Sequence, residues 1–173
     1  MKILSSRVMY IVISVLMVSL IGWSVTQAVQ EKKKIQPQAS QPKHFMIIPA
    51  EIKWVDAPPS VPPGAKLAVL EGDPTKSGLF TMRIKLPAGY KIPPHWHPAV
   101  EHATVISGAL NMGIGDEFDP VRTKELSAGS FSLMPAKVHH FAWVKEETII
   151  QVHGIGPWGI NYVNPSDDPR NKK

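Results

Sequence analysis

The sequence contains no cysteine. Disulfide bonds, thiolate metal ligands, a cysteine nucleophile and a lipid anchor attached through cysteine are therefore excluded. The chain also lacks an arginine-rich stripe interleaved with aromatic residues, so we expect no nucleic-acid binding. Nothing in it resembles a Ser-His-Asp arrangement or a glycine-rich phosphate loop. No window outside the N-terminal segment shows the period of an amphipathic helix. Any chemistry must therefore come from other residue types.

Proline and glycine are plentiful and recur at short intervals. The 173 residues include 17 Pro and 12 Gly, and 43% of the chain is hydrophobic. This content is sufficient for one packed core, and frequent turn residues are typical of an all-β domain. The formal net charge is +5, but several lysines lie in the expected terminal segments. The positive charge therefore does not indicate a binding face.

The N-terminus has the features of an export segment. Lys2 and Arg7 give a basic start, an apolar stretch runs from Val8 to Val25, and Ala28 follows at a position that a signal peptidase accepts. We therefore interpret residues 1–28 as a signal peptide. The alternative is an uncleaved membrane anchor, because the apolar stretch approaches the ~20 residues that span a bilayer. The protein is then periplasmic or secreted, or anchored and facing the periplasm.

The remaining chain divides into three parts. Residues 29–44 are polar and lack periodicity, which predicts a flexible linker. Residues 45–164 form the expected folded domain, and residues 165–173 a C-terminal tail. Antiparallel strands avoid open edges in a closed double-sheet barrel, so we predict an all-β barrel of two sheets. The expected strands are Lys66–Leu70, Phe80–Leu86, Ala103–Ser107, Leu110–Ile114, Ser130–Met134, Phe141–Lys145, Thr148–His153 and Ile160–Val163.

Three histidines and one glutamate have the spacing of a metal site. His95 and His97 lie two residues apart, so they share one face of a strand, and Glu101 has the same parity. A third imidazole must come from elsewhere in the chain, and His140 follows a turn signal closely. This mixed nitrogen and oxygen set suits one divalent transition metal, such as Fe, Mn, Co, Ni, Zn or Cu, and disfavours Ca and Mg.

These residues lie in two stretches that resemble the conserved motifs of the cupin superfamily. Gly89–Gly108 is similar to the first motif, G-x5-H-x-H-x3-E-x6-G, at every fixed position. Gly129–His140 resembles the second motif, G-x5-P-x-G-x2-H, except that Lys137 occupies the place of the second glycine. The resemblance implies a jelly-roll barrel with the metal inside, in a protein that forms homodimers.

The other histidines and aromatic residues have simpler interpretations. His139 and His102 each neighbour a predicted ligand, so their side chains should point to the opposite face of the sheet. His153 ends an expected strand, where it is structural or, alternatively, supports a metal ligand. Four aromatic residues lie near the motifs, and we expect packing roles for most and an apolar pocket above the metal for one or two: Trp96, Phe141, Trp143 and Trp158.

The fold alone does not determine a function. One hypothesis is a metal-dependent oxygenase or other oxidoreductase acting on a small organic substrate, with Glu101 as a catalytic base. A second is a non-catalytic cupin that binds a small ligand or senses the metal. A metal-free structural role is a third. The absence of a clear acid–base residue outside the metal ligands favours the binding protein, and the intact ligand set favours a role for the metal.

Overall fold

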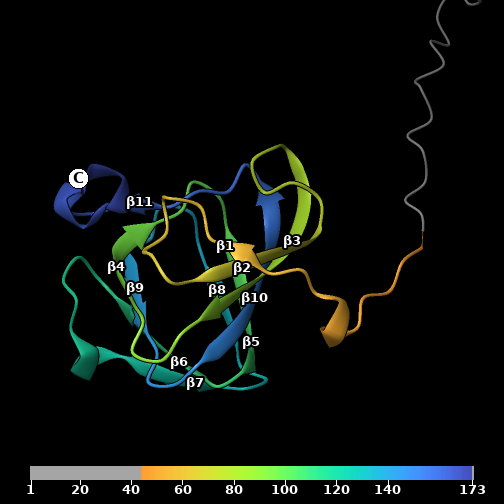
Figure 1. The fold of residues 1–173 in the computed structure, drawn as a ribbon. Coiled ribbons are helices and arrows are strands. Elements are labelled where there is room, and N and C mark those ends of the chain that lie inside the picture. Colours follow the sequence, from red (N-terminus) through yellow and green to blue (C-terminus); the bar gives the residue numbers. More distant parts are fainter. Residues whose placement is uncertain (1–43, 173) are drawn as a thin grey trace, which may run out of the picture. The chain divides into compact units, whose positions relative to one another are not determined.

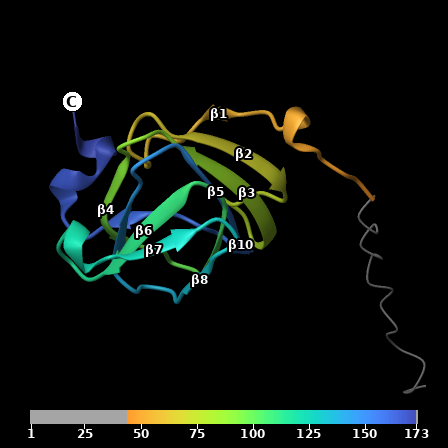
Figure 2. The ribbon, with the colours of Figure 1, turned by 90° about the horizontal axis from the view of Figure 1, so that it is seen from below.

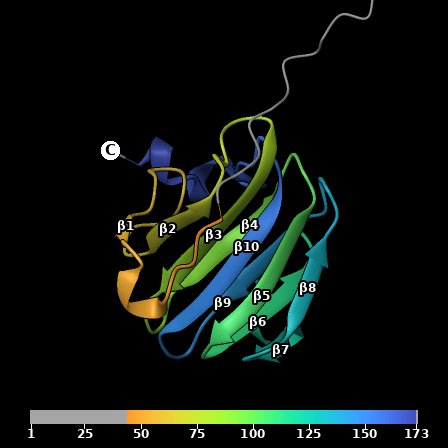
Figure 3. The ribbon, with the colours of Figure 1, turned by 90° about the vertical axis from the view of Figure 1, so that its right-hand side faces the viewer.

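Antiparallel pairing organises residues 44–172, which the computed structural model describes, into two β-sheets. Figure 3 looks onto the larger sheet, in which β10 lies between β3 and β5. The order of its strands is β1 (Val55–Asp56), β2 (Lys66–Glu71), β3 (Gly78–Leu86), β10 (Thr148–Gly156), β5 (Glu101–Ser107) and β8 (Phe131–Met134).

The smaller sheet lies against the first (Figure 1). Its strand order is β11 (Asn161–Tyr162), β4 (Lys91–Trp96), β9 (His140–Trp143), β6 (Ala109–Ile114) and β7 (Lys124–Ser127). Short 3-10 turns complete the described residues: η1 (Pro49–Glu51), η2 (Pro120–Arg122), η3 (Pro165–Asp167) and η4 (Pro169–Asn171). Within residues 44–172, no helix has the length and hydropathy needed to cross a bilayer. The predicted all-β, double-sheet architecture is confirmed.

Alternation of side chains along the strands builds the core between the sheets. In β3 the even-numbered residues Phe80 and Met82 are buried, and in β10 Ile150 and Val152 are buried. Directly opposed residues of an antiparallel pair share a face, and Met82 pairs with Val152. Fully burying an aliphatic or aromatic side chain stabilises a fold by roughly 1.5–3 kcal/mol. The core therefore holds the two sheets together around one interior.

Eight expected strands are present with shifted ends, and three further strands were not expected. The strand β4 carries Pro93 and Pro94, which are disfavoured inside strands because proline lacks an amide hydrogen. The structure accommodates them through an irregularity in the β4–β9 pairing between Ile92 and His95. The strand β7 is polar and lies at a sheet edge, so it lacked the apolar alternation of a half-buried strand. The third, β1, has only two residues.

The predicted export segment, residues 1–28, and the predicted linker up to residue 43 lie outside the described residues.

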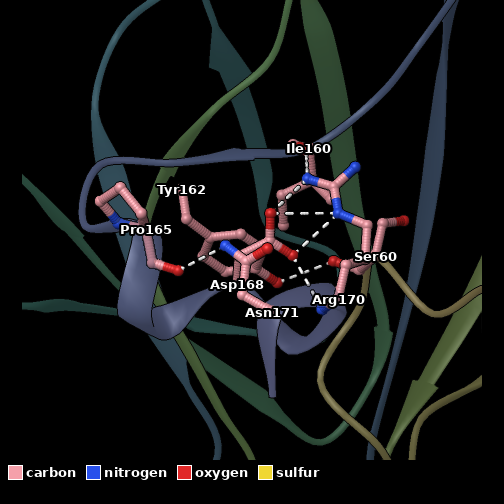
Figure 4. A network of polar contacts seen from close by, with 7 residues as sticks. All are labelled: Ser60, Ile160, Tyr162, Pro165, Asp168, Arg170 and Asn171. Carbon is pink, nitrogen blue, oxygen red and sulfur yellow. Dashed lines mark hydrogen bonds and ion pairs between the residues drawn. The ribbon is translucent and has the colours of Figure 1, made fainter. Parts of the chain in front are cut away.

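The predicted C-terminal tail consists of the turns η3 and η4 as far as it is described, and they lie beside β4 in Figures 1 and 2. Arg170 pairs with the Asp168 carboxylate at 2.6 Å and its guanidinium donates to the Ile160 carbonyl (Figure 4). Asn171 donates to the Pro165 carbonyl at 2.8 Å.

Lys137 adopts the left-handed backbone conformation that the cupin motif assigns to glycine. Its φ angle is 65°, and its amide donates a hydrogen bond of 2.9 Å to the His97 carbonyl. A side chain in this region costs roughly 1–2 kcal/mol because Cβ approaches the following carbonyl. The lysine therefore preserves the turn at the expense of local strain.

We predict that Lys137→Gly stabilises the protein by roughly 0.5–1 kcal/mol. Relief of the left-handed strain exceeds the ~0.5–1 kcal/mol that glycine loses through its freer unfolded state. Urea unfolding of both proteins measures the difference. As the matched control, Gly129→Ala places a Cβ at a φ of 87° with open space around it, and should destabilise. A destabilised Lys137→Gly would show that the lysine side chain itself supports the turn.

Candidate metal centre

Three buried imidazoles form a cluster between the two sheets. His95, His97 and His140 are 4%, 3% and 1% exposed. Each offers one ring nitrogen, and the three nitrogens lie within 4.8 Å of one another. The ring centroids of His95 and His140 are 4.2 Å apart. The structure thus confirms that the predicted histidines meet, and it leaves each of them accessible to one shared ion.

Strand register brings the two sequence motifs together. In the pairing of β4 with β9, His95 lies directly opposite His140. His97 follows the last residue of β4 and shares the face of His95, as its spacing predicts. Glu101 begins β5 in the other sheet, where it pairs with Met134. The site therefore draws residues from both sheets.

Each histidine of the cluster is oriented by a backbone carbonyl. The Nδ1 atoms of His95 and His97 lie 2.7 Å from the carbonyl oxygens of Pro93 and Gly159, and Nδ1 of His140 lies 3.0 Å from that of Val138. A carbonyl oxygen only accepts hydrogen bonds, so each Nδ1 carries the proton. The Nε2 lone pairs remain for a ligand, which is the arrangement found in metal-binding histidines.

Glu101 contacts this cluster through His97. Its Oε2 lies 3.2 Å from His97 Nε2, and the carboxylate is 6% exposed. In the neutral ring that carries its proton on Nδ1, as metal binding requires, the Nε2 lone pair lies close to the carboxylate oxygen. A cation between or beside them removes that repulsion. A transition metal fits this requirement, because the facing donors are imidazole nitrogens and a carboxylate oxygen.

Burial favours the neutral form of His95 and His140, which is the form that binds a metal. Loss of solvation places the pKa of His95 well below its ordinary value of 6.5, and the neighbouring His140 and His97 lower it further. Loss of solvation also lowers the pKa of His140. At neutral pH these two rings therefore carry no proton that a metal must displace.

The cluster opens onto a small inner cavity of about 40 Å³. Its other walls are largely aliphatic and include Ile84, Ile92 and Val152. Val61 also lines it, from the proline-rich segment that precedes β2. A dry aliphatic wall strengthens electrostatic interactions at the cluster, since little solvent screens them.

Trp158 connects the aromatic and acidic parts of the site. Its indole stacks on His97, with ring centroids 4.8 Å apart and an angle of 23° between the planes. Its Nε1–H donates to Glu101 Oε2 at 2.9 Å. The sequence indicated only that some aromatic residue near the motifs lines a pocket. The position of Trp158 in the sequence gave no signal of its hydrogen bond to Glu101.

The remaining histidines lie on outer surfaces, as sequence parity predicts for two of them. His139 lies 2.6 Å from the Asp116 carboxylate, away from the cluster. His102 and His153 oppose one another across β5 and β10 and stack with centroids 4.9 Å apart. His153 is therefore paired with His102, and it does not support a ligand of the cluster. This outcome overturns the alternative considered for it.

A family model matches residues 25–159, and its description is a domain of unknown function, DUF4437. The chain belongs to this family. No curated protein matches the chain at a significant level. The family match covers both motifs and all four proposed ligands, and it includes Trp158.

Solved structures show that this DUF4437 chain has the cupin fold. An acetylacetone dioxygenase from Acinetobacter johnsonii matches with a TM-score of 0.58 and 16% identity, covering 79% of this chain and 88% of the other. The polyketide cyclase RemF from Streptomyces resistomycificus matches with a TM-score of 0.58, 17% identity, and 73% and 90% coverage. An RmlC-like cupin from Shewanella frigidimarina matches with a TM-score of 0.51 and 20% identity, covering 67% of this chain and 92% of the other.

We predict that the metal-free protein loses stability as the pH falls from 7 to 5. Unfolded histidines, with pKa values near 6.5, bind protons in this range, whereas His95 and His140 have lowered pKa values when folded. Each histidine that stays neutral in the fold contributes at most about 1.4 kcal/mol per pH unit. Urea unfolding after chelation measures the slope. The double variant His95→Gln/His140→Gln should flatten it, and an equal slope would contradict the assignment.

Proposed function

We propose that this protein binds one divalent transition metal through His95, His97, His140 and Glu101 and uses it in oxygenase or related oxidoreductase chemistry on a small organic molecule. The proposal is supported chiefly by three buried imidazoles whose ligand nitrogens lie within 4.8 Å of one another while each Nδ1 is held by a carbonyl. Four protein ligands leave positions for water or substrate on an octahedral ion. The metal, when bound, supplies a Lewis acid or redox centre.

The chain's own residues would contribute binding and proton transfer. The imidazoles hold the ion without adding charge, and the Glu101 carboxylate neutralises one of its two positive charges. The same carboxylate lies beside the inner cavity and has a second oxygen that accepts a substrate proton. The aliphatic cavity wall excludes water from reactive species. Two similar folds, the acetylacetone dioxygenase and the polyketide cyclase, belong to proteins named as catalysts of reactions on small organic molecules.

A binding protein without catalysis is the second candidate. Within the described residues, the acidic side chain that lines the inner cavity is Glu101, and it is also a proposed metal ligand. A catalyst that needs a separate acid and base would lack one of them here. In this alternative the metal fixes a small ligand, or its occupancy is itself the signal.

The expected homodimer, the small-molecule partner and the export to the periplasm remain predictions.

We predict that one transition metal binds per chain and that His95→Ala or His140→Ala loses it. The melting temperature should rise with metal in the unaltered protein, because the ion binds only the folded state. Elemental analysis of protein purified without an affinity tag, together with calorimetric melting, measures both effects.

The matched control is His139→Ala, one residue from His140 on the opposite face. This side chain contacts Asp116 instead of the cluster, so metal content should be unchanged. Full metal retention in the His95→Ala/His140→Ala double variant would overturn the assignment. A variant could also lose the metal because it no longer folds. Circular dichroism and unfolding curves in chelator distinguish this case, since a variant that lacks only the ligand still unfolds cooperatively without metal.

We predict that Glu101→Gln retains the fold but abolishes most turnover. The side chains are nearly isosteric, and three imidazoles remain to hold the ion. Losing a general base lowers a rate by about 10²–10⁴-fold. The measurement pairs O₂ uptake with ligand binding for both proteins, each loaded fully with Fe, Mn, Ni or Cu. An unaltered protein that binds a ligand tightly, yet is inert with every metal, would favour the binding protein.

A further inference from the structure

A second, larger space also borders the Trp158 indole. This outer cleft has a volume of about 370 Å³. One wall comes from the segment before β2 and includes Pro58 and Ser60, and another comes from Trp158 and Gly159. Met82 of β3, a fully buried core residue, also lines it. Trp158 is therefore shared between the outer cleft and the inner cavity beside the imidazoles.

The two spaces differ in what they can hold. The inner cavity, at about 40 Å³, has room for no more than a few water molecules. The outer cleft, at about 370 Å³, lies in the range of small-molecule binding sites, which runs from roughly 300 to 1,000 Å³. An organic molecule therefore fits the outer cleft but not the inner cavity, and the indole of Trp158 lines both spaces.

The chemistry of the cleft indicates the kind of molecule. Its walls are mainly apolar, through Val55, Leu67, Met82 and the indole, with the hydroxyl-bearing Ser60 and Thr75 among them. The described residues that line it include no lysine or arginine. Its acidic residue, Asp56, pairs with Lys66 at 2.7 Å. A carboxylate or phosphate would find no basic side chain among these residues and would lose solvation, so the cleft favours an uncharged molecule.

The cleft's walls are tied together around the indole. Tyr162 donates a hydrogen bond of 2.9 Å to the Ser60 carbonyl, and the Arg170–Asp168 pair holds the neighbouring Ile160 carbonyl (Figure 4). His97 Nδ1 contacts the Gly159 carbonyl. The Trp158 amide also donates to the Pro74 carbonyl at 2.7 Å, so the backbone at and after Trp158 is held in place, whereas its indole can rotate about the side-chain bonds.

We propose that the outer cleft binds an uncharged, mainly apolar organic molecule, and that Trp158 controls the passage of this molecule to the metal centre. The proposal rests on the proposed function, because the destination is the metal site. Rotation of Trp158 breaks the bond from its Nε1–H to Glu101 Oε2. Entry of the molecule is thus coupled to release of the carboxylate oxygen, which then becomes available to the ion or to a substrate proton.

Binding of 2-naphthol to the metal-free protein tests the cleft. Its affinity should exceed that of 2-naphthoate, a molecule of similar size with a charge, by at least tenfold. Gly159→Leu adds a side chain to a residue that lines the cleft, where a Cβ meets nothing within 4 Å, and should weaken 2-naphthol binding at least tenfold. Ser60→Phe, on the opposite wall, should do the same and serves if the first variant is unstable. Unchanged binding in folded variants, or equal binding of the two probes, would overturn the assignment.

Paramagnetic relaxation tests the passage. In protein loaded with Co²⁺, the protons of 2-naphthol should relax at least severalfold faster in Trp158→Ala than in the unaltered protein, because the probe reaches the ion. Trp158→Phe keeps an aromatic ring but loses the N–H donor, and should give an intermediate rate. Equal relaxation in all three would overturn the role of Trp158. The binding of 2-naphthol in the cleft is measured without metal. Failure to bind Co²⁺ would therefore overturn the proposed function, while the 2-naphthol measurement would still test the cleft.

Discussion

The antiparallel register of β4 and β9 is the constraint on which the site depends. It sets His95 opposite His140, so imidazoles from two distant motifs share one face of the smaller sheet. Strand side chains alternate with a period of two, so a slip of one residue would turn His140 outward and bring His139 inward. Lys137 keeps the preceding turn tight through its amide bond to the His97 carbonyl, and this turn fixes the register.

Desolvation and backbone hydrogen bonds then prepare the cluster electrostatically. Burial makes protonation of His95 and His140 unfavourable, and carbonyl groups hold the Nδ1 protons, so unprotonated ring nitrogens are left close together in the cluster. Such an arrangement is repulsive on its own and costs stability. The Glu101 carboxylate adds to the repulsion beside His97 at 3.2 Å. An ion offsets all of these contacts together, which gives a physical reason for the donor set to persist in a buried position.

The end of the barrel nearest the cluster is closed by segments distant in sequence. The proline-rich segment inserts Val61 into the interior, and its carbonyls accept hydrogen bonds from Tyr90 and Tyr162. Trp158 closes the remaining side and contacts both Glu101 and His97. One indole therefore contacts both an imidazole of the cluster and the acidic residue beside it.

The all-β class, the two motifs and the histidines that cluster could be predicted from the sequence, because alternation and ligand spacing are local properties. The sequence placed His95 and His97 on a strand but did not give the bounds of β4, since Pro93 and Pro94 argue against a strand unless an irregular pairing absorbs them. Nor did it reveal the role of Trp158, which depends on contacts across 57 and 61 residues of sequence. Tertiary structure decided these features, because register and side-chain contacts between distant segments arise only when the two sheets pack.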